Sequence, residues 1–140
     1  MSYTNKNCVE VVDVANDHKS ILAISAIPAG TLLGIFDGQA KMADLGEDET
    51  GSNLSDHFWR QSTHLLREGR TLYYLDQTGD LSGIDYLNHS CRPNARVENF
   101  LFVYADRDID LGEEIVADYR TFILIEQGLP CWCPIPRCVL

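Results

Sequence analysis

Asn88-His89-Ser90-Cys91-Arg92-Pro93-Asn94 is the stretch of this chain that says most about its fold. It places two amide side chains, a histidine and a cysteine in one polar loop. Its counterpart near the C-terminus is Cys131-Trp132-Cys133-Pro134-Ile135-Pro136-Arg137-Cys138. One loop thiol and three tail thiols are the four soft ligands that complete a tetrahedral zinc site. Such a site would hold the end of the chain against the loop.

The cysteines also permit a different use. Five is an odd count, and two disulfides could use four of them in a secreted protein. The polar N-terminal residues show no export signal. Cys131 and Cys133 are badly placed to bridge each other but can both face one ion. Zinc is therefore favoured, and Cys8, the cysteine left over, is expected to be a buried small hydrophobe.

The bulk composition limits the class of protein. A chain of 140 residues that is 45% hydrophobic suffices for one domain with a single core. Nowhere do about 18 apolar residues follow one another. We therefore expect no membrane partner and a soluble, intracellular protein, in the cytoplasm or the nucleus.

The charge balance is strongly acidic. Eleven Lys and Arg residues stand against twenty-one Asp and Glu residues, for a formal net charge of −10. This charge repels phosphate backbones and attracts cationic partners. Direct nucleic-acid binding is disfavoured, and a basic protein or peptide partner is favoured. The acidic run over 44–49 is interpreted as a solvated loop, with docking of a basic peptide as the alternative.

Short runs rich in β-branched and aromatic residues, separated by turn residues, dominate the pattern. Strands are expected at 9–14, 21–26, 31–36, 64–67, 70–75, 100–105 and 114–119. The fourth and fifth of these form a hairpin around Glu68-Gly69. A loop with at most one helical turn is expected over 41–51, and a short helical segment over 53–61. The domain is predicted to be mainly β.

Three motifs follow one another in the chain: the Asn-His-Ser-Cys loop, Gly112-Glu113-Glu114-Ile115-Val116-Ala117-Asp118-Tyr119, and the Cys-x-Cys-x4-Cys tail. In this order and spacing they resemble the SET-domain protein lysine methyltransferases with a post-SET zinc tail. Ile27-Pro28-Ala29-Gly30-Thr31-Leu32-Leu33 is similar to an upstream run of the same family. The resemblance covers residues 9–140.

The resemblance implies a SET-domain (β-clip) fold of short sheets, few short helices and a knot-like C-terminal threading over 1–125. A post-SET zinc-binding tail over 126–140 would belong to the same structural unit. S-adenosylmethionine and the target lysine would enter from opposite faces and meet in a narrow channel. The implied activity is transfer of a methyl group to a lysine ε-amine of a basic protein or peptide, for which a histone-like protein is one candidate.

The family roles can be carried onto individual residues. Tyr119 would be the catalytic tyrosine beside the reacting methyl group. The methyl donor would be held by Lys19, Ser20, Tyr86, Leu87, Asn88 and His89. The lysine channel would be lined by Phe36, Ala117 and Trp132, although Trp132 could instead shield the metal. One structural Zn²⁺ would be bound by Cys91, Cys131, Cys133 and Cys138, with no open coordination position for chemistry.

The chemistry of methyl transfer is compatible with a tyrosine at position 119. In-line displacement at a sulfonium carbon needs a neutral amine and accurate positioning. A free lysine has a pKa of about 10.4, so a desolvated channel and a nearby positive charge must favour loss of its proton. A phenol can hydrogen-bond the amine without trapping it as an ammonium ion, as a carboxylate would.

Three positions depart from the family pattern. His18-Lys19-Ser20 stands where family members have a Gly-x-Gly that lets the backbone approach the donor closely. Phe36 replaces a tyrosine that flanks the substrate. Ala117 replaces a larger aromatic residue that limits how many methyl groups fit, so higher methylation states are predicted to be sterically allowed.

The departures keep a second hypothesis open. A catalytically inactive SET-fold module that binds a peptide or a protein partner would tolerate the changes at 18–20 and at Phe36. The intact Asn88, His89 and Tyr119 favour the enzyme. A zinc-stapled module unrelated to methyl transfer would require the motif matches to be accidental.

Overall fold

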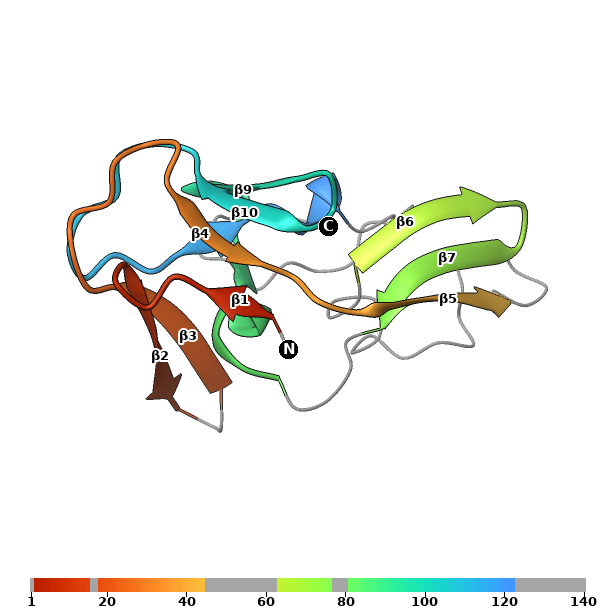
Figure 1. The fold of residues 1–140 in the computed structure, drawn as a ribbon, viewed down its shortest axis with the longest axis horizontal. Helices are drawn as coiled ribbons and strands as arrows, with labels where there is room; N and C mark the ends of the chain where they lie inside the picture. Colours follow the sequence, from red (N-terminus) through yellow and green to blue (C-terminus); the bar gives the residue numbers. More distant parts are fainter. Residues whose placement is uncertain (1, 16–17, 45–62, 77–80, 123–140) are drawn as a thin grey trace.

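The structure is a computed structural model that describes residues 2–15, 18–44, 63–76 and 81–122. Within these ranges the chain forms short strands and two 3-10 helices (Figure 1). The strands are β1 (Tyr3–Thr4), β2 (Val9–Val14), β3 (His18–Ala23), β4 (Leu32–Ile35), β5 (Gln39–Asp44), β6 (Thr63–Glu68), β7 (Thr71–Asp76), β8 (Asn88–His89), β9 (Ala95–Glu98), β10 (Phe102–Ala105) and β11 (Val116–Ala117). The 3-10 helices are η1 (Gly83–Tyr86) and η2 (Tyr119–Thr121). The predicted mainly β architecture of short sheets is confirmed.

The largest sheet is antiparallel, with the strand order β1-β4-β10-β9. Its centre is apolar because Leu33 on β4 and Val103 on β10 are fully buried. Gly34, also on β4, lies close under η1. A Cβ at this position would come within 2.6 Å of Ile84. The absence of a side chain at residue 34 therefore lets η1 pack directly on the sheet.

Two further antiparallel units flank this sheet (Figure 1). β2 and β3 form a hairpin that is paired from Val9↔Ala23 to Val14↔His18. β5, β7 and β6 form a three-stranded sheet in that order. The turn between β6 and β7 contains Gly69 in the left-handed region, with φ of 59°, so the predicted hairpin around Glu68-Gly69 is confirmed.

A short parallel pair joins parts of the chain that are distant in sequence. β8 pairs with β11 through Asn88↔Val116 and His89↔Ala117. The segment before β11 is held against β3, because the Ile115 N–H donates to the Ile21 carbonyl at 2.8 Å. This pairing lays the Asn-His motif directly beside the motif that ends at Tyr119.

Several segments differ from the sequence predictions. The strand expected over 21–26 is β3 at 18–23, the strand expected over 100–105 begins at Phe102, and β9 was not predicted. The loop expected over 41–51 begins instead as strand β5, since Gln39–Asp44 pairs with β7 along its whole length. The strand expected over 114–119 is reduced to β11 and is followed by η2. The helix turn forms because the Asp118 carboxylate accepts the Arg120 backbone N–H at 3.0 Å and caps η2.

The hydrophobic core runs from the β2–β3 hairpin to η2. Its buried members come from most of the elements: Val9, Ile21, Ala23, Ile27, Leu33, Phe36, Ile84, Leu87, Ala95, Val103, Ala105, Ile109, Ile115, Ala117, Tyr119 and Phe122. Cys8 is a free thiol that is partly buried against this core rather than fully buried. The segment predicted as helical over 53–61 and the predicted tail over 126–140 lie outside the described residues.

Candidate functional site

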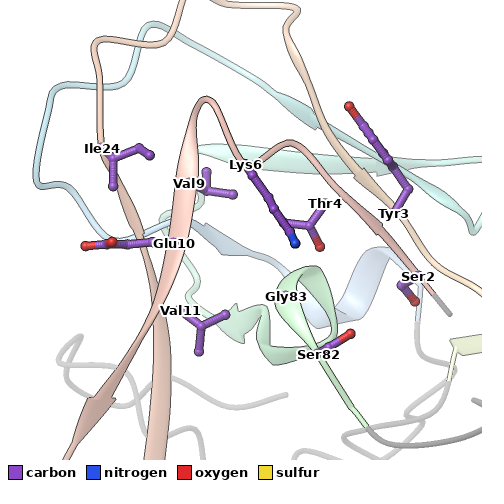
Figure 2. A pocket seen from close by; sticks show the side chains of 10 residues that line it. All are labelled: Ser2, Tyr3, Thr4, Lys6, Val9, Glu10, Val11, Ile24, Ser82 and Gly83. Carbon is purple, nitrogen blue, oxygen red and sulfur yellow. The ribbon is translucent and has the colours of Figure 1, made fainter.

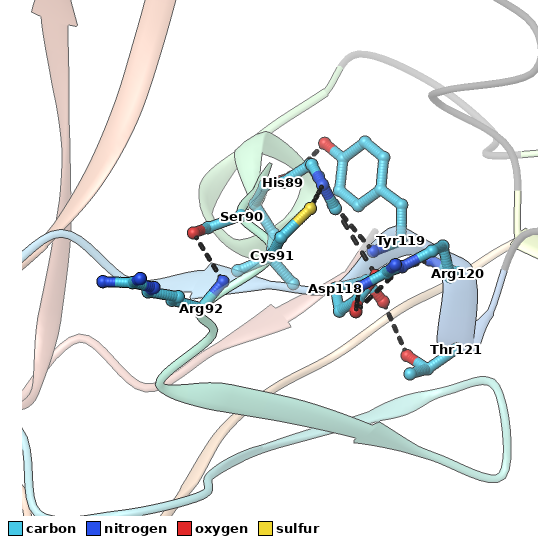
Figure 3. A network of polar contacts seen from close by, with 9 residues as sticks. His89, Ser90, Cys91, Arg92, Asp118, Tyr119, Arg120 and Thr121 are labelled. Atoms are coloured by element: carbon cyan, nitrogen blue, oxygen red, sulfur yellow. Dashed lines mark hydrogen bonds and ion pairs between the residues drawn. The ribbon is translucent and has the colours of Figure 1, made fainter. Parts of the chain in front are cut away.

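Tyr119 is the centre of a network of polar contacts around β8 and η2 (Figure 3). The side chain is 7% exposed, and its hydroxyl donates a hydrogen bond to the Leu87 carbonyl at 2.6 Å. The ring lies 5.4 Å from the ring of Phe122 and 5.2 Å from that of His89. With its hydroxyl proton donated to the backbone, the phenol oxygen can still accept a hydrogen bond.

His89 is fixed by contacts at both ring nitrogens. Its Nδ1 accepts the Tyr119 backbone N–H at 3.0 Å, so Nδ1 carries no proton. The neutral ring then carries its proton on Nε2, which lies 3.2 Å from the Cys91 sulfur. Nε2–H therefore donates toward sulfur. His89 connects the backbone of the predicted catalytic tyrosine to a predicted metal ligand.

Asn88 ties three segments together. Its side-chain amide nitrogen donates to the Lys19 carbonyl at 2.9 Å and to a Glu114 carboxylate oxygen at 3.1 Å. The Ser20 hydroxyl lies 3.4 Å from the same nitrogen. The amide N–H groups thus hold β3 and the segment before β11 against β8. The amide oxygen is the atom of Asn88 that can accept a hydrogen bond from a ligand.

Lys19 lies at the edge of the β2–β3 hairpin, in the segment predicted to take the place of the Gly-x-Gly of the family. Its ammonium group forms an ion pair with Asp13 and lies 5.7 Å from the centre of the Tyr86 ring. Tyr86 is held in turn by its hydroxyl, which donates to the Leu81 carbonyl at 3.0 Å. A cation and an aromatic face therefore lie side by side next to Asn88.

Asp118 precedes Tyr119 and has a shifted acidity. Burial alone would raise the pKa of its carboxyl group. Hydrogen bonds from the Arg120 guanidinium and backbone N–H, together with the guanidinium charge, lower the pKa overall. Its Oδ1 lies 3.9 Å from His89 Nδ1. The carboxylate therefore remains ionised beside the imidazole and the start of η2.

Two of the three residues predicted to line the lysine channel lie in the described part of the structure. Phe36 is buried, and its ring centre lies 6.2 Å from that of Phe122, so Phe36, Phe122 and Tyr119 form a row of aromatic rings. Ala117 is fully buried and pairs with His89 across the parallel strands. Trp132 lies outside the described residues.

The predicted zinc ligands can be followed only in part. Cys91 is disulfide-bonded in the structure, and Cys131, Cys133 and Cys138 lie outside the described residues. Among the residues that the structure does describe, no group of three or more His, Cys, Asp or Glu side chains is placed to hold a metal ion. Zinc binding therefore stays a prediction.

Several residues of the network were not predicted from the sequence. Glu114, Asp118 and Phe122 contact Asn88, His89 and Tyr119, respectively. Glu114 and Asp118 lie inside the motif that ends at Tyr119. Their place in that motif was the sequence signal that could have identified them. Phe122 stands three residues after Tyr119, within one turn of helix, but no strand pattern marks it.

Asn94 follows Pro93, a sequence that is typical of turns. It is instead 2% exposed, and its side chain binds backbone groups some twenty residues away. The amide nitrogen donates to the Glu114 carbonyl at 2.7 Å, and the amide oxygen accepts the Val116 N–H at 2.9 Å. Asn94 therefore acts as a clamp on the start of β11.

A separate pocket of about 670 Å³ lies between β1, β2 and the start of η1 (Figure 2). Its lining includes Thr4, Lys6, Glu10 and Gly83. Among the described residues, none of those predicted to bind the donor, the lysine or the metal lines it. In the described part of the chain no helix is long and apolar enough to cross a membrane.

Comparison with known families agrees with this arrangement of elements. The profile described as "SET domain" matches residues 3–120, a span that includes β1, both strands of the parallel pair and Tyr119. The chain belongs to the SET-domain family. The predicted SET fold of short sheets and few helices is therefore confirmed.

Individual relatives agree with the family assignment. "Histone-lysine N-methyltransferase TRX1" of Oryza sativa subsp. japonica is 39% identical over 71 residues, which is 46% of this chain and 7% of that protein. "Histone-lysine N-methyltransferase, H3 lysine-36 specific" of Schizosaccharomyces pombe is 37% identical over 82 residues, covering 54% of this chain and 10% of the relative. "Histone-lysine N-methyltransferase set1" of Dictyostelium discoideum is 40% identical over 60 residues, covering 38% and 4%. The chain spans a tenth or less of these relatives.

Proposed function

We propose that this domain is a protein lysine methyltransferase that uses S-adenosylmethionine and acts on a lysine of a basic protein, with histones as the first candidates. The observation that carries the proposal is the position of Tyr119. A buried phenol is held by a backbone carbonyl, stands beside His89 and borders a row of aromatic rings. The names of the relatives support the same activity and substrate class, and histones would be met in the nucleus.

The residues around Asn88 fit the chemistry of the donor. S-adenosylmethionine carries a carboxylate, an ammonium group and an adenine ring. Lys19 supplies a cation for the carboxylate, the Asn88 amide oxygen an acceptor for the ammonium group, and Tyr86 an aromatic face for the adenine. When bound, the donor supplies an electrophilic methyl group on a positively charged sulfur.

The role of the protein in the reaction is positioning. Tyr119 accepts a hydrogen bond from the lysine amine and holds its lone pair in line for attack. The aromatic walls of Phe36 and Phe122 exclude water, which disfavours the charged ammonium form of the lysine. His89 holds the Tyr119 backbone in place without contributing a charge of its own. The small, fully buried side chain of Ala117 leaves room for additional methyl groups. We therefore propose that the product carries a higher methylation state, which mass analysis of the product tests.

Tyr119→Phe tests the proposal. The phenylalanine keeps the ring packing but removes the hydroxyl, so methylation of purified core histones should fall about 100-fold or more. Binding of S-adenosylhomocysteine, measured by calorimetry, should change little. Tyr104→Phe is the matched control, because Tyr104 lies on β10 and packs against Arg96 instead.

Donor binding is tested separately. Asn88→Ala removes the amide that faces the donor and should weaken S-adenosylhomocysteine binding about tenfold or more. Wild-type protein that binds donor but leaves histones and other basic proteins unmethylated would favour the inactive binding module. An absence of donor binding would contradict the enzyme altogether.

A further inference from the structure

The turn between β9 and β10 has an unusual residue in a strained conformation. Asn99 and Phe100 both lie in the left-handed region, with φ of 51° and 63°. The Leu101 N–H donates to the Glu98 carbonyl at 3.2 Å, which closes the turn. Glu98 pairs with Phe102, so the loop of this hairpin comprises residues 99–101, and two of its residues are left-handed.

Phe100 occupies the position in this turn that favours glycine. Asparagine tolerates the left-handed region, but a bulky residue with a Cβ is strained there. Burial does not explain the residue either, because the Phe100 side chain is 38% exposed. An exposed aromatic residue at a position where glycine would relieve strain is a reason to look for a functional contact.

The turn lies next to the aromatic row of the candidate site. The Phe36 N–H donates to the Leu101 carbonyl at 2.8 Å, and the Leu101 side chain packs against the core that contains Phe36 and Phe122. In Figure 1 the turn lies at the end of the four-stranded sheet near η2. Phe100 is therefore a partly exposed residue directly before Leu101, whose carbonyl is bonded to the Phe36 end of the aromatic row.

We propose that Phe100 is a substrate-contacting residue that binds the basic segment around the target lysine. The inference rests on the proposed function. Its aromatic face would hold an arginine or lysine side chain that flanks the methylated residue, by cation–π attraction and by contact with the aliphatic stem. The same sheet already holds such a pair, with the Arg96 guanidinium 5.1 Å from the centre of the Tyr104 ring. The net charge of −10 favours a cationic occupant.

Two substitutions separate contact from folding. Phe100→Gly removes the ring and relieves the strain, whereas Phe100→Ala removes the ring and keeps a Cβ in the left-handed region. Both should raise the KM for purified core histones about threefold to tenfold, with kcat within about twofold of wild type, because one cation–π contact is lost. Phe100→Gly should leave Tm unchanged or raise it, whereas loss of a structural ring would lower it.

Leu111→Ala is the matched control. Leu111 is a 69% exposed apolar residue in another turn, and its loss should leave KM unchanged. An unchanged KM in both Phe100 variants would overturn the proposal, as would an equal rise in the Leu111 variant or a fall in Tm with Phe100→Gly.

A binding measurement distinguishes failure of this inference from failure of the proposed function. Fluorescence anisotropy with a labelled lysine- and arginine-rich histone tail peptide needs no turnover. Weaker binding by both Phe100 variants would support the contact even where wild-type protein transfers no methyl group. Equal affinities, or no binding by wild-type protein, would overturn it.

Discussion

At the scale of single residues, Asp118 is the group whose ionisation connects the site to stability. Its carboxylate caps η2 through the Arg120 N–H and pairs with the Arg120 guanidinium at 2.6 Å. The next residue in the chain is Tyr119, and the Asp118 carboxylate also faces His89. Any change of charge at Asp118 therefore acts on the backbone that carries the phenol.

The lowered pKa of Asp118 sets the direction of a pH dependence. The folded state binds this proton more weakly than the unfolded chain, whose carboxyl group titrates near 3.8. The stabilising contribution is therefore fully present above that pH and is lost as pH falls through the lower pKa of the folded state.

Asp118→Asn tests this dependence, because asparagine can still cap a helix but carries no charge. At pH 7 the variant should unfold at lower urea concentration, with a loss of about 1 kcal/mol. The difference from wild type should disappear in acid below the folded-state pKa. Asp106→Asn, at an exposed carboxylate facing Arg96, should show a smaller effect. A stability difference that keeps the same size as the pH falls from 7 into acid would contradict the assignment.

At the scale of elements, the parallel pair β8–β11 depends on Asn94. The pair has only two residue partners, so its own backbone hydrogen bonds hold it weakly. The Asn94 clamp adds two side-chain bonds to residues 114–116 and the backbone N–H of Asn94 donates to the Val116 carbonyl. The position of Tyr119, two residues after β11, follows from these bonds.

Asn94→Ala should therefore weaken both the fold and the site. It leaves the partly buried Val116 N–H and Glu114 carbonyl without side-chain partners, at a cost of about 1–3 kcal/mol in urea unfolding. Hydrogen exchange at the Val116 amide should accelerate at the same time. Asn99→Ala, in the exposed β9–β10 turn, is a control in which the Val116 amide should keep its protection. An unaltered exchange rate in Asn94→Ala would refute the clamp.

The same elements show what the sequence could predict. β2 and β7 consist largely of β-branched or aromatic residues, and their positions were predicted within one residue. β5 has the sequence Gln-Ala-Lys-Met-Ala-Asp, which has no strand preference of its own, and it is a strand because β7 pairs with it. The partners of Asn94 are distant in sequence, so the sequence alone showed only a Pro-Asn pattern that is typical of turns.

The candidate site was predictable where motifs carry it. The family resemblance placed Asn88, His89 and Tyr119 in one site. In the structure His89 contacts Tyr119 by a hydrogen bond and a ring contact, and Asn88 is paired with Val116, three residues before Tyr119. Their catalytic roles stay predictions. Phe100 could not be predicted, because a left-handed phenylalanine is a property of backbone geometry and its sequence context is an ordinary strand run.

At the scale of the whole molecule, the zinc prediction concerns how the tail is attached. We predict that protein purified under reducing conditions binds one zinc ion per chain by native mass spectrometry. Chelation should lower Tm and weaken S-adenosylhomocysteine binding, because a structural zinc ion contributes directly to folding free energy. Cys91→Ser should lose the metal, whereas Cys8→Ser should keep it, because Cys8 is a free thiol packed against the core.

The disulfide at Cys91 provides the alternative outcome. Thiol titration of the unfolded chain after purification without reductant counts the cysteines that are oxidised. If the protein is zinc-free, has oxidised cysteines and retains its donor affinity, then a disulfide at Cys91 takes the place of the predicted metal.

The parallel pair also has a consequence for how the protein is made. Asn88 leaves the ribosome well before Val116, and these two residues meet only across the β8–β11 contact. A nascent chain that stops before residue 116 has the Asn-His motif but no partner strand and no Tyr119. Assembly of the β8–β11 pair must therefore await synthesis of Val116 and Ala117, so a premature stop before Val116 would leave the Asn-His motif without its partner strand while sparing most of the sheets.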